Sequence, residues 1–177
     1  MKIGVIGMGF VGGTTAKILE STHKILPYDR YKSQFQDPSV LSNAEIVFLC
    51  VPTPMKPSGE IDYSPIHNSL ETLVGVTDEN KNKPLVVVRS TAVSGTTDKL
   101  DEMYPFRFVF NPEFLREKNA LEDMMDTNRI IIGANTDEDF ETLASVYRPI
   151  FPNAHYIKTD RKTAEMVKYA ANVMLTG

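Results

Sequence analysis

Apolar residues follow two alternating patterns along the chain. Short, nearly continuous apolar runs that are rich in β-branched residues predict strands covered on both faces. These runs lie at 2–6, 24–28, 46–51, 85–89, 106–110, 129–132 and 155–158. Segments with apolar residues at helical spacing predict helices at 11–19, 65–73, 95–103, 138–147 and 162–175. This alternation predicts an α/β fold with a doubly wound, mostly parallel sheet and a helix at the end of the chain.

The last of these helices depends on one apolar stripe. Its members recur at helical spacing and are Met166, Val167, Ala170, Val173 and Met174. Elsewhere, the stretch 53–62 is rich in Pro, Gly and Ser and is expected to be a loop. Nothing between these elements marks a clean domain boundary.

Length, charge and cysteine content narrow the possible classes of protein. The 177 residues suit one domain, and the net charge of −4 offers no basic surface to nucleic acid or to an anionic membrane. No apolar stretch approaches the roughly 20 residues of a membrane span, and the apolar start is too short for a signal peptide. The single cysteine, Cys50, excludes a disulfide within the chain and fits a reducing, cytoplasmic setting. His23, His67 and His155 lack metal-binding spacing, so we expect no metal.

A glycine-rich turn joins the first predicted strand to the first predicted helix. Its three glycines are Gly7, Gly9 and Gly12. In a dinucleotide site the first permits the tight turn, the second lets a pyrophosphate approach the backbone, and the third allows the helix to pack closely on the strand. The amides from Phe10 through Val11 to Gly12 would then face the phosphates at the positive end of the helix dipole.

An acidic residue follows the second predicted strand. Asp29 lies about 20 residues beyond the glycine turn, where a carboxylate accepts hydrogen bonds from a ribose. The same carboxylate would repel a 2′-phosphate, so NAD is the expected cofactor, although the neighbouring Arg30 leaves NADP open. The alternative is a glycine-rich turn beside an ordinary surface acid.

Four further segments, taken with the glycine turn, resemble the UDP-glucose/GDP-mannose dehydrogenase family. They are Val-Pro-Thr-Pro at 51–54, Arg-Ser-Thr-Ala-Val-Ser-Gly-Thr-Thr at 89–97, Asn-Pro-Glu-Phe-Leu-Arg-Glu at 111–117 and Ala-Glu-Met-Val-Lys-Tyr-Ala-Ala-Asn at 164–172. The third is the most specific, and all four occur in the family's order. The resemblance implies a Rossmann-like NAD-binding domain from an enzyme of polysaccharide biosynthesis. Such enzymes oxidise a sugar nucleotide, for example UDP-glucose, to the uronate in two NAD-linked steps.

The resemblance also implies which residues border the cofactor at the carboxyl ends of the third and fourth strands, where doubly wound sheets bind ligands. These are Val51, Pro52, Thr53, Ser90 and Thr91. Thr91 would also act in catalysis by ordering water, because a threonine hydroxyl is a poor base. Alternatively, Ser90, Thr91 or Ser94 caps the helix that begins near residue 95.

The segment 111–117 carries implied substrate chemistry. Glu113 would position or deprotonate the water that hydrolyses a thioester intermediate. Phe114, Leu115 and Arg116 would line the sugar-nucleotide site through their backbone, and Glu117 would lie near the cofactor. The alternative for Glu113 is a solvated charge in a polar loop.

Two polar residues of the last helix complete the implied catalytic set. Lys168 and Asn172 are four residues apart, so they project from one face of the helix. By resemblance they contact the substrate, where an ammonium and an amide stabilise an alkoxide or a tetrahedral oxyanion. The alternative is a solvated lysine beside an unrelated asparagine.

The family's nucleophile has no counterpart in this sequence. It is a cysteine in a Phe-Gly-Gly-x-Cys segment of a second domain, and Cys50 falls instead within a predicted buried strand, where a thiol is usually inert. The resemblance therefore implies an NAD-binding domain at 1–160 and the start of a central linking helix at 161–177, without the nucleotide-sugar-binding domain. A chain truncated in this way is expected to be inactive alone and to bind NAD weakly, whereas the full-length protein could form a homodimer.

Two other functions remain open at this point. A β-hydroxyacid dehydrogenase of the 6-phosphogluconate type also combines a glycine turn with a Lys-x-x-x-Asn pair. The segment 111–117 and the extra strand–helix unit at 129–147 argue against it. The other is a stand-alone, non-catalytic dinucleotide-binding module. The sugar also stays open among UDP-glucose, GDP-mannose and the UDP-N-acetyl-hexosamines.

Overall fold

The computed structural model describes the backbone of residues 1–176 and the side chains of residues 1–171. The strands are β1 (Lys2–Ile6), β2 (Lys24–Tyr28), β3 (Ile46–Leu49), β4 (Leu85–Val88), β5 (Arg107–Phe110), β6 (Arg129–Gly133) and β7 (His155–Thr159). The α-helices are α1 (Phe10–Leu19), α2 (Ser64–Val76), α3 (Thr96–Met103), α4 (Ala120–Met125), α5 (Asp137–Tyr147) and α6 (Arg161–Thr176). Every predicted strand and helix is present, and the predicted α/β fold is confirmed.

Four short helical segments fall where the sequence pattern predicts neither a helix nor a strand. They are α4 and the 3-10 helices η1 (Ser33–Phe35), η2 (Pro38–Asn43) and η3 (Glu117–Asn119). Each spans at most six residues. That is too short for apolar residues to recur visibly at helical spacing, so periodicity cannot detect them.

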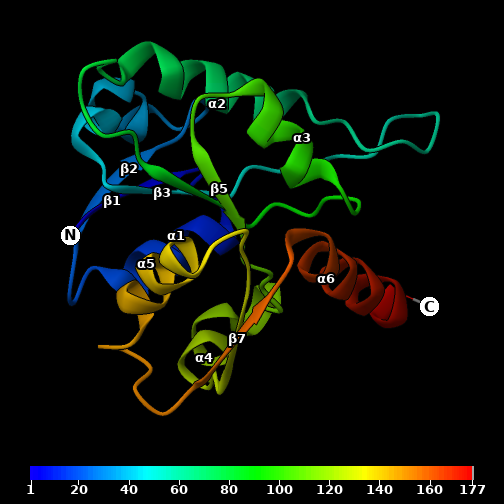
Figure 1. Cartoon of the computed structure of the whole chain (residues 1–177). Coiled ribbons are helices and arrows are strands. Elements are labelled where there is room, and N and C mark those ends of the chain that lie inside the picture. The colour runs from blue at the N-terminus through cyan, green and yellow to red at the C-terminus, as the bar shows by residue number, and fades with distance from the viewer. Residues whose placement is uncertain (177) are drawn as a thin grey trace.

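The sheet has a reversal next to its first strand. Its order is β2-β1-β3-β4-β5-β6-β7, and β1 pairs in parallel with both β2 and β3 (Figure 1). The sheet therefore extends from β1 in both directions, and the loops that follow β1 and β3 run apart at the carboxyl ends of these two strands. Such a reversal opens a crevice, which is where sheets of this kind bind ligands.

The last two strands extend beyond the parallel part of the sheet. A single antiparallel pair, Phe110 with Gly133, joins β5 to β6, and each residue is the last of its strand. The rest of β6 and its parallel partner β7 therefore lie past the carboxyl end of β5. Figure 1 shows β7 passing α4 and leading to the start of α6. These strands flank the carboxyl edge on one side.

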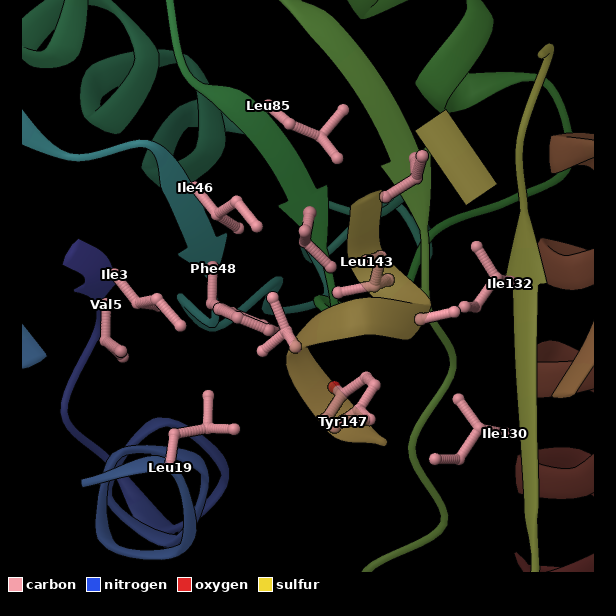
Figure 2. Packing of buried hydrophobic residues seen from close by; sticks show 14 of the residues in the cluster. Ile3, Val5, Leu19, Ile46, Phe48, Leu85, Ile130, Ile132, Leu143 and Tyr147 are labelled. Carbon is pink, nitrogen blue, oxygen red and sulfur yellow. The ribbon is translucent and has the colours of Figure 1, made fainter. Parts of the chain in front are cut away.

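Two hydrophobic clusters cover the two faces of the sheet. The first packs α1, α4 and α5 on one face, and Figure 2 shows Leu19 and Leu143 converging on it. In this cluster the rings of Phe48 and Tyr147 meet edge to face with centroids 6.2 Å apart. The second packs α2, α3 and α6 on the opposite face. Burial on both faces explains why the strands are almost continuously apolar.

Helix α6 docks on the domain through charged side chains. The buried guanidinium of Arg161 pairs with Asp98 (Nε–Oδ1 2.6 Å) and Asp101 (Nη1–Oδ2 2.9 Å). One turn later, the buried carboxylate of Glu165 accepts hydrogen bonds from the backbone N–H groups of Gly95 and Thr97, both at 2.9 Å. Burial raises the pKa of Glu165, although these hydrogen bonds oppose the rise.

The described part of the apolar stripe that predicts this helix faces outward, and the side chains of Val173 and Met174 lie outside the described residues. Met166, Val167 and Tyr169 are exposed, as is Ala170. The inner face is polar because each buried charge on it has a partner in the domain. Periodicity therefore predicts the helix correctly, although the apolar spacing does not identify the side that α6 buries.

Candidate functional site

The glycine turn has the geometry that a dinucleotide requires. Gly7 adopts a φ of 91°, a conformation that favours glycine. A Cβ on Gly12 would lie 1.7 Å from the carbonyl oxygen of Gly7, so helix α1 can approach β1 only without that side chain. A Cβ on Gly9 would meet nothing within 4 Å, and this leaves open space in front of the N-terminus of α1. The turn therefore fits a pyrophosphate.

Asp29 is held beside this turn by backbone amides. Its Oδ2 accepts a 2.8 Å hydrogen bond from the N–H of Met8, and its Oδ1 accepts one of 2.9 Å from the N–H of Tyr31. Lys32 donates from Nζ to the carbonyl of Met8 at 2.6 Å. The carboxylate is only partly buried, and each oxygen keeps a lone pair that a ribose hydroxyl can use.

A cleft of about 450 Å³ opens at this point. It lies between the carboxyl ends of β1, β2 and β3 and the first half of α2, and we call it the adenosine cleft. Its lining includes Gly7, Asp29, Tyr31, Val51, Pro52 and Asn68. The sequence did not single out Tyr31 or Asn68, because an exposed tyrosine and a helical asparagine carry no motif of their own.

The ends of β3 and β4 are tied together by hydroxyl groups. Ser90 donates from Oγ to the carbonyl of Val51 at 2.6 Å, and Thr53 donates from Oγ1 to the carbonyl of Thr91 at 2.8 Å. These bonds hold Thr91 at the carboxyl edge. They also bring four predicted cofactor residues from two separate segments, 51–53 and 90–91, into contact.

The alternative in which Ser90, Thr91 or Ser94 caps α3 is wrong. The N-cap of α3 is Gly95, which makes no side-chain capping bond. At this end of α3 the carboxylate of Glu165 accepts hydrogen bonds from the backbone N–H groups of Gly95 and Thr97. Ser94 instead donates to the carbonyl of Lys162 at 3.1 Å. A carboxylate from another helix therefore replaces a local cap, which no local sequence signal could reveal.

Glu113 and Lys168 form a buried ion pair. Nζ of Lys168 lies 2.8 Å from Oε1 of Glu113 and also donates to the Glu113 carbonyl, and both side chains are less than a tenth exposed. The other carboxylate oxygen accepts a 2.8 Å hydrogen bond from the N–H of Leu115. Neither residue is the solvated charge of the alternative interpretation. The side chain of Asn172 lies outside the described residues.

The rest of the 111–117 segment is more open. Phe114 is about half exposed, and its ring centroid lies 5.6 Å from Nζ of Lys168. Arg116 binds Asp123 through two side-chain hydrogen bonds and lowers the pKa of that carboxyl group. Glu117 is exposed at the start of η3. These residues can meet a ligand that approaches the carboxyl edge.

Sequence reasoning missed a buried polar network behind this segment. Arg89 donates from Nη1 to Oη of Tyr147 at 2.8 Å, and Tyr147 donates to Oδ1 of Asn111 at 2.6 Å. Asn111 in turn donates to the carbonyl of Ile131 at 2.9 Å. Burial raises the pKa of Tyr147 to about 12, so its hydroxyl stays protonated at neutral pH. The one available signal was a charged residue directly after the apolar run of β4.

Cys50 lies one residue beyond β3, not within it as predicted. It is only partly accessible and packs under the glycine turn, where a Cβ on Gly12 would lie 3.3 Å from its own Cβ. Burial raises the pKa of the Cys50 thiol to about 12. Its thiolate is therefore scarce at neutral pH. Among the described residues, no group of three or more His, Cys, Asp or Glu side chains could hold a metal ion.

The strand, glycine turn and helix, with the acid and the cleft beside them, define a dinucleotide-binding domain of the Rossmann type. The model of the NAD-binding domain of the UDP-glucose/GDP-mannose dehydrogenase family matches residues 26–151. The chain therefore belongs to this family, and NAD is its cofactor. Within the described residues, no helix combines the length and apolar character that a membrane crossing needs.

Known proteins agree with this assignment. The UDP-glucose 6-dehydrogenase of Rickettsia felis is 34% identical over 167 residues, which cover 90% of this chain and 36% of that protein. The UDP-glucose 6-dehydrogenase of Rickettsia bellii is 32% identical over 215 residues, which cover 99% of this chain and 49% of that protein. A UDP-glucose dehydrogenase structure from Pyrobaculum islandicum has a TM-score of 0.83 at 26% identity, covering 98% of this chain and 49% of its own. This chain thus spans half or less of the length of these relatives.

Proposed function

We propose that this chain supplies the NAD-binding part of a cytoplasmic enzyme that oxidises UDP-glucose, or a related sugar nucleotide, to its uronate for polysaccharide biosynthesis. The observation that carries the proposal is the convergence of two sites on one sheet edge. The glycine turn with Asp29 fits the cofactor, and the buried Glu113–Lys168 pair, which follows β5 on the same edge, is the proposed place of reaction. The names of the similar Rickettsia proteins support UDP-glucose as the first candidate.

Each predicted site residue has a role in this proposal. Gly7, Gly9, Phe10, Val11, Gly12 and Asp29 bind the adenosine and pyrophosphate, and Val51, Pro52, Thr53, Ser90, Thr91 and Glu117 border the rest of the cofactor. Lys168 withdraws electron density from a substrate oxygen, and Glu113 accepts a proton once the substrate displaces its ammonium partner. Thr91 and Asn172 assist them, and residues 114–116 line the substrate site.

The proposal extends to the whole protein. Residues 1–160 form the cofactor domain, and residues 161–177 begin a helix that links it to a nucleotide-sugar-binding domain, where a full-length homodimer could form. Family membership disfavours the 6-phosphogluconate type of enzyme. A stand-alone NAD-binding module remains as the second candidate, and it differs in predicting no sugar-nucleotide chemistry in any form of the protein.

Cofactor binding tests the proposal directly. Isothermal titration is expected to give measurable, weak binding of NAD and of ADP-ribose to the chain, with NADP weaker than NAD. Asp29→Ala is expected to weaken NAD binding about tenfold, because a hydrogen bond to a charged group is worth about 1.5–3 kcal/mol. The control is Asp78→Ala, an exposed acid in the loop after α2. The proposal fails if the wild-type chain binds none of these ligands.

A further inference from the structure

Among the side chains that the structure describes, Arg89 is a buried cation without a carboxylate partner. It directly follows β4, is 6% exposed, and uses Nη1 to donate to Tyr147. Its Nε is buried and has no hydrogen-bond partner among the described residues, and no carboxylate there lies within ion-pair distance of the guanidinium. A buried charge without compensation is costly, so this position favours neutral or negative neighbours over cations.

Arg89 lines a cavity of about 390 Å³ at the carboxyl ends of β4 and β5. The overhanging strand β6 and the helices α4 and α5 supply the other walls. Much of the lining is apolar and includes Leu115, Met124 and Ile130, while Tyr147 adds a hydroxyl next to the guanidinium. A flat ring with little charge suits such a lining.

The other charges around this cavity are compensated or exposed. The carboxylates of Glu113 and Asp123 are each bound by a cation. Asp126 and Arg129 carry opposite charges and face solvent, which screens them. Arg89 is therefore the buried charge that dominates the cavity electrostatically.

The cavity and the adenosine cleft lie at different points along the same edge of the sheet. The cleft is at the ends of β2, β1 and β3, and the cavity is at the ends of β4, β5 and β6. With its adenosine ribose at Asp29 and its pyrophosphate at the N-terminus of α1, a dinucleotide must extend its second nucleoside toward β4. The nicotinamide end is thereby directed to the cavity.

We infer that Arg89 makes this site select the reduced form of the cofactor. The nicotinamide end enters the cavity beside Arg89, where the neutral dihydronicotinamide is favoured over the positively charged oxidised ring. Arg89 is thus a specificity-determining residue that separates NADH from NAD⁺ by charge. This inference rests on the proposed function and goes beyond it, because cofactor binding alone requires no preference between the two forms.

The test compares three ligands by isothermal titration with the 177-residue chain. They are NAD⁺, NADH and ADP-ribose, which lacks the nicotinamide. We expect the wild type to bind NADH about tenfold more tightly than NAD⁺, because like charges in a partly buried site repel each other. Arg89→Met is expected to abolish the preference, and Arg89→Lys to keep it. ADP-ribose is expected to bind all three proteins equally.

The outcomes distinguish failure of the inference from failure of the proposed function. Equal Kd values for NAD⁺ and NADH in the wild type overturn the inference, as does a preference that persists in Arg89→Met. If Arg89→Met does not fold, the wild-type ratio decides, together with Tyr147→Phe, which keeps the charge and must keep the preference. If the wild type binds neither ADP-ribose nor NADH, the proposed function itself fails.

Discussion

Gly9 and Gly12 lie three positions apart in one turn, yet a methyl group would meet opposite surroundings at the two sites. At Gly12 it would collide with the Gly7 carbonyl, whereas at Gly9 it would project into the space proposed for the pyrophosphate. We expect Gly12→Ala to lower the free energy of unfolding by about 1–3 kcal/mol or more, because overpacking forces the backbone apart. Gly9→Ala is expected to leave stability within about 1 kcal/mol of the wild type but to weaken NAD binding.

Urea unfolding and titration with NAD measure these two effects separately. The matched control is Gly13→Ala in the same helix, where the nearest atom to the added Cβ lies 3.9 Å away. Alanine there is expected to stabilise the helix by about 0.5–1 kcal/mol. Equal destabilisation by all three substitutions would contradict the distinct roles of these glycines.

The local sequence predicts the role of a residue when that role depends on residues close to it in the chain. The glycine spacing and Asp29 belong to this kind, because a turn, a helix start and a strand end fix their surroundings. The contacts of Glu113 with Lys168 and of Arg89 with Tyr147 join residues 55 and 58 positions apart. Spacing along the chain carries no information about such pairs, so only the resemblance suggested Glu113 and Lys168, and only its place directly after an apolar run marks Arg89.

At the scale of elements, α6 is fastened to the domain by charges, and one of these contacts can be tested alone. Lys168→Met would leave the Glu113 carboxylate buried without its cation, and we expect this to lower the free energy of unfolding by about 3–5 kcal/mol. Adding Glu113→Gln removes the stranded charge, so the double variant is expected to be more stable than Lys168→Met alone. Urea unfolding of the four proteins in this double-mutant cycle gives the coupling energy.

The coupling energy between Lys168 and Glu113 shows whether the two side chains form the buried pair. A coupling energy of about 1–3 kcal/mol is expected for side chains in direct contact. Additive losses would mean that Lys168 and Glu113 do not form the buried pair. Met166→Ala on the outer face of the same helix is the control, and it is expected to change stability by less than about 0.5 kcal/mol because that side chain is exposed.

Periodicity predicts the elements well but their orientation less well. The seven strands and five longer helices follow from runs and spacing because burial on one or two faces leaves a repeating pattern. The antiparallel pairing of β6 does not, since the same apolar run suits either direction. The buried side of α6 does not follow from periodicity either, because its inner face carries partnered charges such as Arg161, Glu165 and Lys168.

At the scale of the whole molecule, the only cysteine sits in a place unsuited to covalent catalysis. A thiol with a pKa of about 12 is almost entirely protonated at neutral pH. We therefore expect the 177-residue chain to produce no NADH from UDP-glucose, GDP-mannose or a UDP-N-acetyl-hexosamine. Absorbance of NADH over hours at high enzyme concentration provides the measurement, and Cys50→Ala serves as the control. Steady turnover that Cys50→Ala abolishes would overturn this view of the thiol.

The hydrogen bond between Asp29 and the Met8 amide has a consequence for any attempt to re-engineer coenzyme choice. The carboxylate that would discriminate between a free 2′-hydroxyl and a phosphorylated one is also a brace for the phosphate-binding turn. A small neutral replacement would remove the repulsion but leave the Met8 N–H without its acceptor. A swap toward NADP therefore needs a new acceptor at the same place as well as a new cation, and single substitutions at position 29 are a poor route to it.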